Sequence, residues 1–167
     1  MVDEAAAGDS RWLLKAVREA TGELFGQFAG VDERGLRWRP GRGEWCLKEI
    51  AGHLRDAERL YQRQIEVIAR GRPSAAGPLL PHEPVDVLPY ERDYRSEPLS
   101  RLLSEYEAAR EETFWILYTL DEADWRRCGR HPYRGRVSVY DIARELHEHD
   151  LQHLYQAQRL RKSLRER

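Results

Sequence analysis

The chain has 167 residues, of which 34% are charged and 41% hydrophobic, and its formal net charge is −1. This length predicts a single domain spanning residues 1–167, and the near-neutral charge argues against nucleic-acid binding, which requires clustered positive charge. No apolar run reaches membrane-spanning length and the first residues lack the apolar core of a signal peptide, so we expect a cytoplasmic protein without membrane contact.

Four segments show the three- and four-residue spacing of apolar side chains that predicts amphipathic helices. They cover about residues 9–28, 46–70, 96–120 and 138–162. No convincing strand pair, internal repeat or low-complexity segment lies between them. The pattern predicts an all-α protein, namely a four-helix bundle.

All three connections between these helices are long. The second one, residues 71–95, contains five prolines and no helical period. A connection of this length is unusual in a compact domain unless it covers a site or a subunit contact. The third, after about residue 120, is expected to hold one short helical turn and then a loop. Such connections also allow crossings instead of simple up-and-down hairpins.

Three of the six histidines lie close together near the C-terminus, at positions 147, 149 and 153. Residues four apart share one face of a helix, so His149 and His153 lie together on the inward stripe, whereas His147 points away from them. His53 occupies the middle of the inward stripe of the 46–70 helix. Three histidines are therefore expected to face the same bundle interior from two helices.

A buried imidazole needs a partner, and one divalent metal ion would satisfy all three nitrogens. Three neutral imidazoles with one open position are the ligand set of a catalytic zinc site. In the alternative interpretation they are core histidines that are hydrogen bonded to Asp56 or Asp150. The same two carboxylates are candidates to orient a metal-bound imidazole through its second nitrogen. His82 and His131 lie in predicted loops and are expected to be structural.

Two separated stretches resemble the DinB-like family, also called the YfiT-like metal-dependent hydrolases. Residues 38–58 read "WRPGRGEWCLKEIAGHLRDAE", with a Trp-x-Pro stretch, a second Trp and a helical His. In residues 124–156 a loop of the form H-P-x-x-G-x-V leads into a helix of the form HD-x-x-HL-x-Q. The resemblance covers nearly the whole chain and implies a four-helix bundle with a metal at His53, His149 and His153.

The resemblance also assigns structural roles around the start of the 46–70 helix. Trp38, Pro40 and Trp45 correspond to scaffold residues that fix the entry into this helix. Cys46 stands where the family often has a Ser or Thr that caps the helix together with Glu49. A cysteine caps poorly, so we expect Cys46 to be packed and not to act as a nucleophile.

The family includes thiol-dependent S-transferases, a thiol-dependent isomerase and members without known activity. The resemblance therefore implies a metal-dependent enzyme of the hydrolase or S-transferase type that acts on a small molecule. Zinc or nickel is the expected metal, iron and manganese also accept three imidazoles, and a low-molecular-weight thiol is a further candidate cofactor. Two alternatives are a non-catalytic metal-binding or stress-response protein and a helical dimerisation module. A homodimer is expected in any case, since Trp115 and Tyr118 lie off the inward stripe of their helix.

Overall fold

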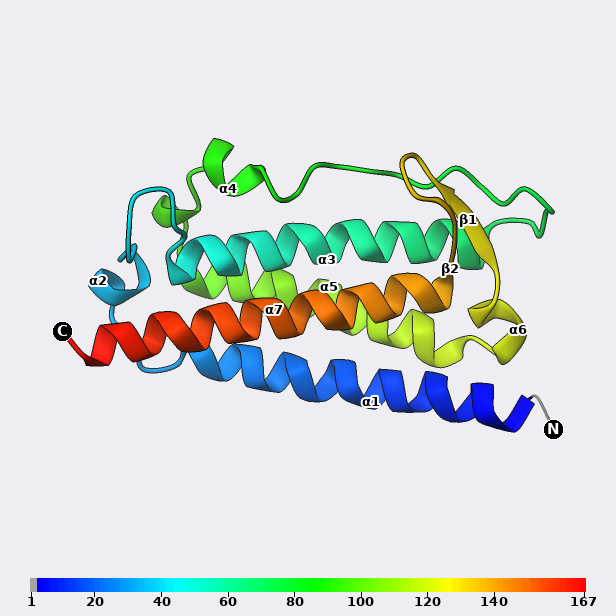
Figure 1. Cartoon of the computed structure of the whole chain (residues 1–167), viewed down its shortest axis with the longest axis horizontal. Coiled ribbons are helices and arrows are strands. Elements are labelled where there is room, and N and C mark those ends of the chain that lie inside the picture. Colours follow the sequence, from blue (N-terminus) through cyan, green and yellow to red (C-terminus); the bar gives the residue numbers. More distant parts are fainter. Residues whose placement is uncertain (1–2) are drawn as a thin grey trace.

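The computed structural model describes residues 3–167 and is dominated by four long helices, shown in Figure 1. Helix α3 packs against α5 and α7, while α1 packs against α7 and α5. This arrangement confirms the expected four-helix bundle. No helix in the described part of the chain is long and apolar enough to cross a membrane. The long helices are α1 (Asp3–Phe28), α3 (Leu47–Arg70), α5 (Leu99–Thr119) and α7 (Val139–Arg165).

The helices are not joined as simple up-and-down hairpins. In Figure 1, α1 and α7 run in one direction and α3 and α5 in the other. Two consecutive long helices that are parallel need a connection that returns along the bundle, and residues 71–98 provide it. This segment, here called the strap, includes the short helix α4 (Leu88–Glu91) and the 3-10 turn η1 (Tyr94–Ser96). The crossover that the long connections allowed is therefore present.

The strap is held against α3 by specific contacts. The side-chain amide of Gln64 donates a hydrogen bond to the Pro81 carbonyl oxygen at 2.9 Å. The ring of Tyr94 lies directly on Gly52, where an added Cβ would be only 2.3 Å from the ring. Because Gly52 precedes His53, this contact holds the strap next to the part of α3 that carries His53.

A small β-hairpin connects α5 to α7, which corrects the expectation that the chain holds no strand pair. After the short helix α6 (Glu122–Trp125), strand β1 (Cys128–His131) pairs antiparallel with β2 (Gly135–Ser138). Strands of four residues are too short to show an alternating pattern. The hairpin also gains support that local sequence does not reveal, because the Leu80 amide donates to the Arg130 carbonyl oxygen at 2.9 Å.

Five of the eight ends of the long helices agree with the sequence to within one residue, and three differ. Helix α7 extends to Arg165, beyond the expected end near residue 162. Helix α1 already begins at Asp3, and α5 begins at Leu99 because Pro98 is its extended N-cap residue and not part of its first turn. At the start of α3, Cys46 is the N-cap and its amide donates to Glu49 Oε2 at 2.8 Å. Burial raises the pKa of the Cys46 thiol to about 11, which agrees with a packed residue and not with a nucleophile.

A polar layer divides the hydrophobic core into two clusters. One cluster gathers around residues such as Leu24, Leu54 and Leu160, and the other around Leu13, Ile65 and Leu146. Between them, at the middle of the bundle, lie buried polar side chains and the three inward histidines. The buried non-histidine members of this layer are Glu58, Arg110, Thr113 and Asp150, and the half-buried Thr21 accepts a hydrogen bond from Arg110.

An aromatic patch is exposed on α5. Trp115 is 56% and Tyr118 62% exposed, and their rings contact each other. A dimer interface on this patch stays a prediction.

Candidate metal centre

His53, His149 and His153 meet in the middle of the bundle. His53 lies on the buried stripe of α3 and is fully buried, while His149 and His153 follow one another by one turn of α7. The Nε2 atom of His149 lies 2.8 Å from Nε2 of His53 and 3.1 Å from Nε2 of His153. In residues 3–167, this is the only group of three or more His, Cys, Asp or Glu whose ligand atoms all lie within 4.8 Å of one another.

The outer nitrogens of two of these rings are held by oxygen acceptors. His53 Nδ1 lies 3.2 Å from the carbonyl oxygen of Val85, which belongs to the strap. His153 Nδ1 lies 2.9 Å from Gln156 Oε1. A carbonyl or amide oxygen only accepts hydrogen bonds, so each Nδ1 carries the proton and donates it. Nε2 of His53 and of His153 is therefore left with a free lone pair that faces the centre of the group.

The three inner nitrogens cannot satisfy one another by hydrogen bonding. Nε2 of His149 carries at most one proton, which it can donate either to His53 or to His153. The partner at the other contact, at 2.8 or 3.1 Å, then keeps a lone pair without a donor, and if His149 Nε2 is unprotonated, lone pairs repel at both contacts. A cation at the centre turns this repulsion into attraction, and neutral imidazole is the commonest protein ligand of metals. The donor set therefore fits a divalent metal ion.

The three imidazoles bind protons weakly, so protons compete poorly with a metal ion for their nitrogens. Burial, followed by repulsion between the positive charges of protonated neighbouring imidazoles, lowers the pKa of His53 to about 4 and that of His149 to about 2. Burial also lowers the pKa of His153. All three rings are therefore neutral near pH 7, which is the protonation state that coordinates a metal.

Aromatic side chains enclose the histidines. The indole of Trp45 stacks parallel to His153, with 5.8 Å between ring centroids, and lies 4.9 Å from the ring of His53. On the other side, the Tyr61 ring contacts His149 edge to face at 5.8 Å. Trp45, expected as a scaffold residue, is therefore also a wall of the site. Such packing restricts the rotamers of the imidazoles.

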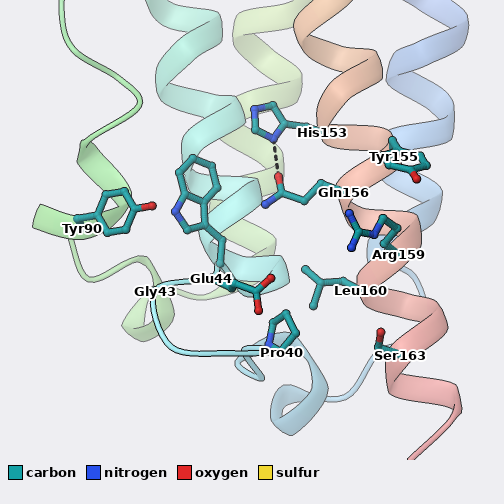
Figure 2. Close-up of a pocket in the computed structure, with 11 residues that line it drawn as sticks. Pro40, Gly43, Glu44, Tyr90, His153, Tyr155, Gln156, Arg159, Leu160 and Ser163 are labelled. Atoms are coloured by element: carbon teal, nitrogen blue, oxygen red, sulfur yellow. Dashed lines mark hydrogen bonds between the residues drawn. The ribbon is translucent and has the colours of Figure 1, made fainter.

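Two cavities reach the histidines. The larger, about 650 Å³, is lined by His149 and His153 together with strap residues 82–87 and the hairpin residue His131. The smaller, about 510 Å³, reaches His153 only and is shown in Figure 2. There the hydrogen-bonded pair of His153 and Gln156 lies at one end, with Tyr90 on one side and Tyr155 and Arg159 on the other. The larger cavity gives access to more of the histidine group.

Comparison with known proteins identifies the family of this chain. The model of the DinB superfamily matches residues 13–157. The chain belongs to the DinB superfamily. The protein YuaE of Bacillus subtilis is 20% identical over 157 residues, which cover 87% of this chain and 95% of YuaE.

Solved structures with a similar fold include three further proteins. YfiT from B. subtilis, described as a probable metal-dependent hydrolase with an unusual four-helix bundle topology, superposes with a TM-score of 0.81 at 13% identity, covering 93% of this chain and 87% of YfiT. The four-helix bundle protein TT2238 has a TM-score of 0.65 at 17% identity, covering 89% of this chain and 98% of its own. The DinB-like protein YjoA of B. subtilis gives 0.58 at 17% identity, covering 91% of both chains.

Asp56 and Asp150 were expected as candidates to orient a metal-bound imidazole. In the structure of this DinB-superfamily chain, both accept hydrogen bonds from other side chains. Asp56 accepts hydrogen bonds from Arg55 Nε at 3.0 Å, from Arg92 Nη1 at 2.9 Å and from the Tyr94 hydroxyl. Asp150 accepts two hydrogen bonds from the Arg110 guanidinium, at 2.7 and 2.9 Å. Asp56 anchors the strap and Asp150 belongs to the core, while Val85 and Gln156 supply the oxygens that face the imidazoles.

The remaining histidines lie outside the triad. His147 points away from it and packs edge to face against Trp12 at 5.9 Å. His82 and His131 contact each other across the larger cavity, with 5.1 Å between ring centroids. His131 accepts hydrogen bonds at Nδ1 from the amides of Tyr133 and Arg134, both at 3.2 Å, and so shapes the hairpin turn.

Sequence reasoning missed three residues around the DinB-superfamily site. A signal existed for Gln156, because it follows His153 by three residues and therefore shares its helix face. No such signal existed for Val85 or Asp86, which lie in the strap without any period. Asp86 Oδ1 lies 3.8 Å from His53 Nε2.

Proposed function

We propose that this chain is a metal-dependent enzyme that holds one divalent ion with Nε2 of His53, His149 and His153. The observation that carries the proposal is the convergence of these nitrogens at 2.8 and 3.1 Å while oxygen acceptors hold the opposite nitrogens of two rings. Zinc or nickel suits three imidazoles best, and iron or manganese are alternatives. The description of YfiT as a probable metal-dependent hydrolase supports the same assignment.

A divalent ion in such a site lowers the pKa of a bound water or thiol, so that either becomes a nucleophile at neutral pH. The chain itself supplies the other requirements of catalysis. Trp45 and Tyr61 restrict the imidazoles, and the 650 Å³ cavity offers room for a small-molecule substrate beside His149 and His153. We propose hydrolysis or thiol-dependent S-transfer as the reaction type, the latter with a low-molecular-weight thiol as second reactant.

Elemental analysis of the chain purified without a histidine tag tests the metal. We expect about one divalent ion per chain in the wild type and in His147→Ala, and much less in His149→Ala. His147 is the matched control because it lies on the same helix but outside the group. Absence of metal from the wild type after addition of zinc or nickel would contradict the proposal.

Activity screens then separate the reaction types. A hydrolase is expected to cleave ester, amide or related substrates without a thiol, whereas an S-transferase requires one. Either activity must be lost in His149→Ala and kept in His147→Ala. If the wild type binds metal but is active in neither screen, the protein is a non-catalytic metal-binding protein instead.

A further inference from the structure

The strap brings a carboxylate to the inner face of the histidine group. The carbonyl oxygen of Val85 holds His53 Nδ1 at 3.2 Å, and the next residue, Asp86, places Oδ1 3.8 Å from His53 Nε2. Nε2 is the nitrogen whose lone pair faces the centre of the group. Two consecutive strap residues therefore contact opposite nitrogens of one imidazole, and Asp86 lies on the side where a metal would bind.

The distance between these two atoms suits a shared metal ion. Zinc lies about 2.1 Å from a histidine nitrogen and about 2.0–2.2 Å from a carboxylate oxygen, so two ligand atoms on one ion are at most about 4.3 Å apart. The 3.8 Å between His53 Nε2 and Asp86 Oδ1 falls within this limit. Among the residues described, only the three histidines have ligand atoms that all lie close to one another, so the side chain of Asp86 must rotate inward to coordinate the same ion. Its side chain is 85% exposed and has room to rotate.

Of the other acidic side chains that line the larger cavity, Glu83 and Glu145 are paired with arginines, whereas Glu148 has no ion pair within the described part of the chain. Glu83 Oε2 accepts from Arg63 Nη2 at 3.1 Å, and the Glu145 carboxylate accepts from Arg134. Asp86 instead approaches His53 Nε2 at 3.8 Å, and no arginine or lysine among residues 3–167 pairs with it. The carboxylate of Asp86 is thus available for a cation in the histidine group, and it would offset part of the charge of a divalent ion held by three neutral ligands.

We propose that Asp86 is a fourth protein ligand of the metal, supplied by the strap to the ion that His53, His149 and His153 hold. The inference rests on the proposed function, because it requires the histidines to bind the ion. It makes the strap part of the metal centre. Metal binding would then tie the return connection to helices α3 and α7, and the water or thiol of the proposed reaction would take a fifth position on the ion, on the side of the larger cavity.

Titration of the metal-free full-length chain with Co²⁺ tests the proposal, because visible absorption reports the coordination of this ion. The variants are Asp86→Ala, which removes the ligand, and Asp86→Asn, which removes only its charge. Glu83→Gln is the matched control, since Glu83 lies in the strap and lines the same cavity. We expect Kd to rise about tenfold or more in Asp86→Ala, with a changed spectrum. Glu83→Gln should behave as wild type.

Each other outcome has a definite meaning. A wild-type Kd and spectrum in Asp86→Ala would overturn the fourth ligand and leave the three-histidine site intact. Weaker binding with an unchanged spectrum would show that Asp86 acts only through its charge, which also overturns coordination. If the wild type binds neither Co²⁺ nor Zn²⁺, the proposed function fails and the fourth ligand with it. Far-UV circular dichroism of each variant checks that the exposed substitution leaves the helices intact.

Discussion

Two polar clusters contain neighbouring residues of α7 and differ in how their hydrogen-bond donors and acceptors are arranged. Asp150 belongs to a buried ion-pair cluster in which the Arg110 guanidinium also donates to Glu58 Oε2 at 2.7 Å. His149 belongs to the histidine group, whose inner nitrogens face one another with more lone pairs than protons. In the ion-pair cluster one guanidinium bridges two carboxylates, although Arg110 Nε and Glu58 Oε1 have no hydrogen-bond partner in residues 3–167, whereas in the histidine group the inner nitrogens converge on one point. Burial and single unpaired atoms therefore do not distinguish a site, whereas lone pairs that converge on one point indicate one.

The ion-pair cluster is expected to be a stability element. Burial by itself lowers the pKa of Arg110, but the negative charges of Glu58 and Asp150 hold this pKa well above its usual value. Arg110→Met leaves both carboxylates buried without their cation, which should lower the free energy of unfolding by about 3–5 kcal/mol. Urea unfolding measures the change. Arg101→Met, which removes an exposed ion pair with Glu105 on the same helix, should have a much smaller effect, because exposed ion pairs contribute little to stability. Equal effects of both substitutions would contradict the contrast.

The histidine group should make the metal-free chain sensitive to mild acid. The pKa values of His53 and His149 are about 4 and 2, below the value of about 6.5 in the unfolded chain. Between pH 7.5 and 5.5 the unfolded chain therefore takes up protons that the folded chain refuses. The free energy of unfolding should fall by about 1.4 kcal/mol for each of these two residues.

Urea unfolding of the metal-free protein at both pH values measures this loss, and His149→Ala should show a smaller one. An equal loss in wild type and variant would contradict a neutral, buried His149.

Metal should stabilise the folded chain through the histidine group alone. A ligand that binds only the folded state at one hundred times its Kd adds about 2.7 kcal/mol to the free energy of unfolding. We expect this gain in the wild type and in His147→Ala, and its loss in His153→Ala. Urea unfolding with and without zinc gives the values. Stabilisation of His153→Ala equal to that of wild type would place the ion elsewhere.

The hydrogen bond from His153 to Gln156 should have the smallest effect. Gln156→Leu removes the acceptor at 2.9 Å that fixes the tautomer and orientation of the ring. Loss of such a partner lowers metal affinity by about 10- to 100-fold. Gln152→Leu, one turn earlier and exposed, should leave the Kd unchanged. Competition with a chromophoric chelator measures both constants, and equal Kd values for the two variants would remove the role of Gln156.

Helical spacing was enough to find the helices of the bundle and the inward position of His53, His149 and His153. Both are local properties, since the angle between residues on one helix follows from the chain itself. The hairpin at 128–138 and the start of α5 could not be found in this way. The hairpin depends on pairing with the strap, and the start of α5 depends on the extended conformation at Pro98.

The sequence by itself determined which side chains face the interior of the bundle, because periodicity and burial coincide on an amphipathic helix. Only the tertiary structure decided how those polar groups pair. Asp56 and Asp150 stand beside the histidines in sequence but belong to other networks, because arginines from distant segments reach them. Val85 and Asp86 reach His53 only because the strap returns along α3. Contacts between segments so far apart follow from how the helices are connected in space, and no local pattern encodes them.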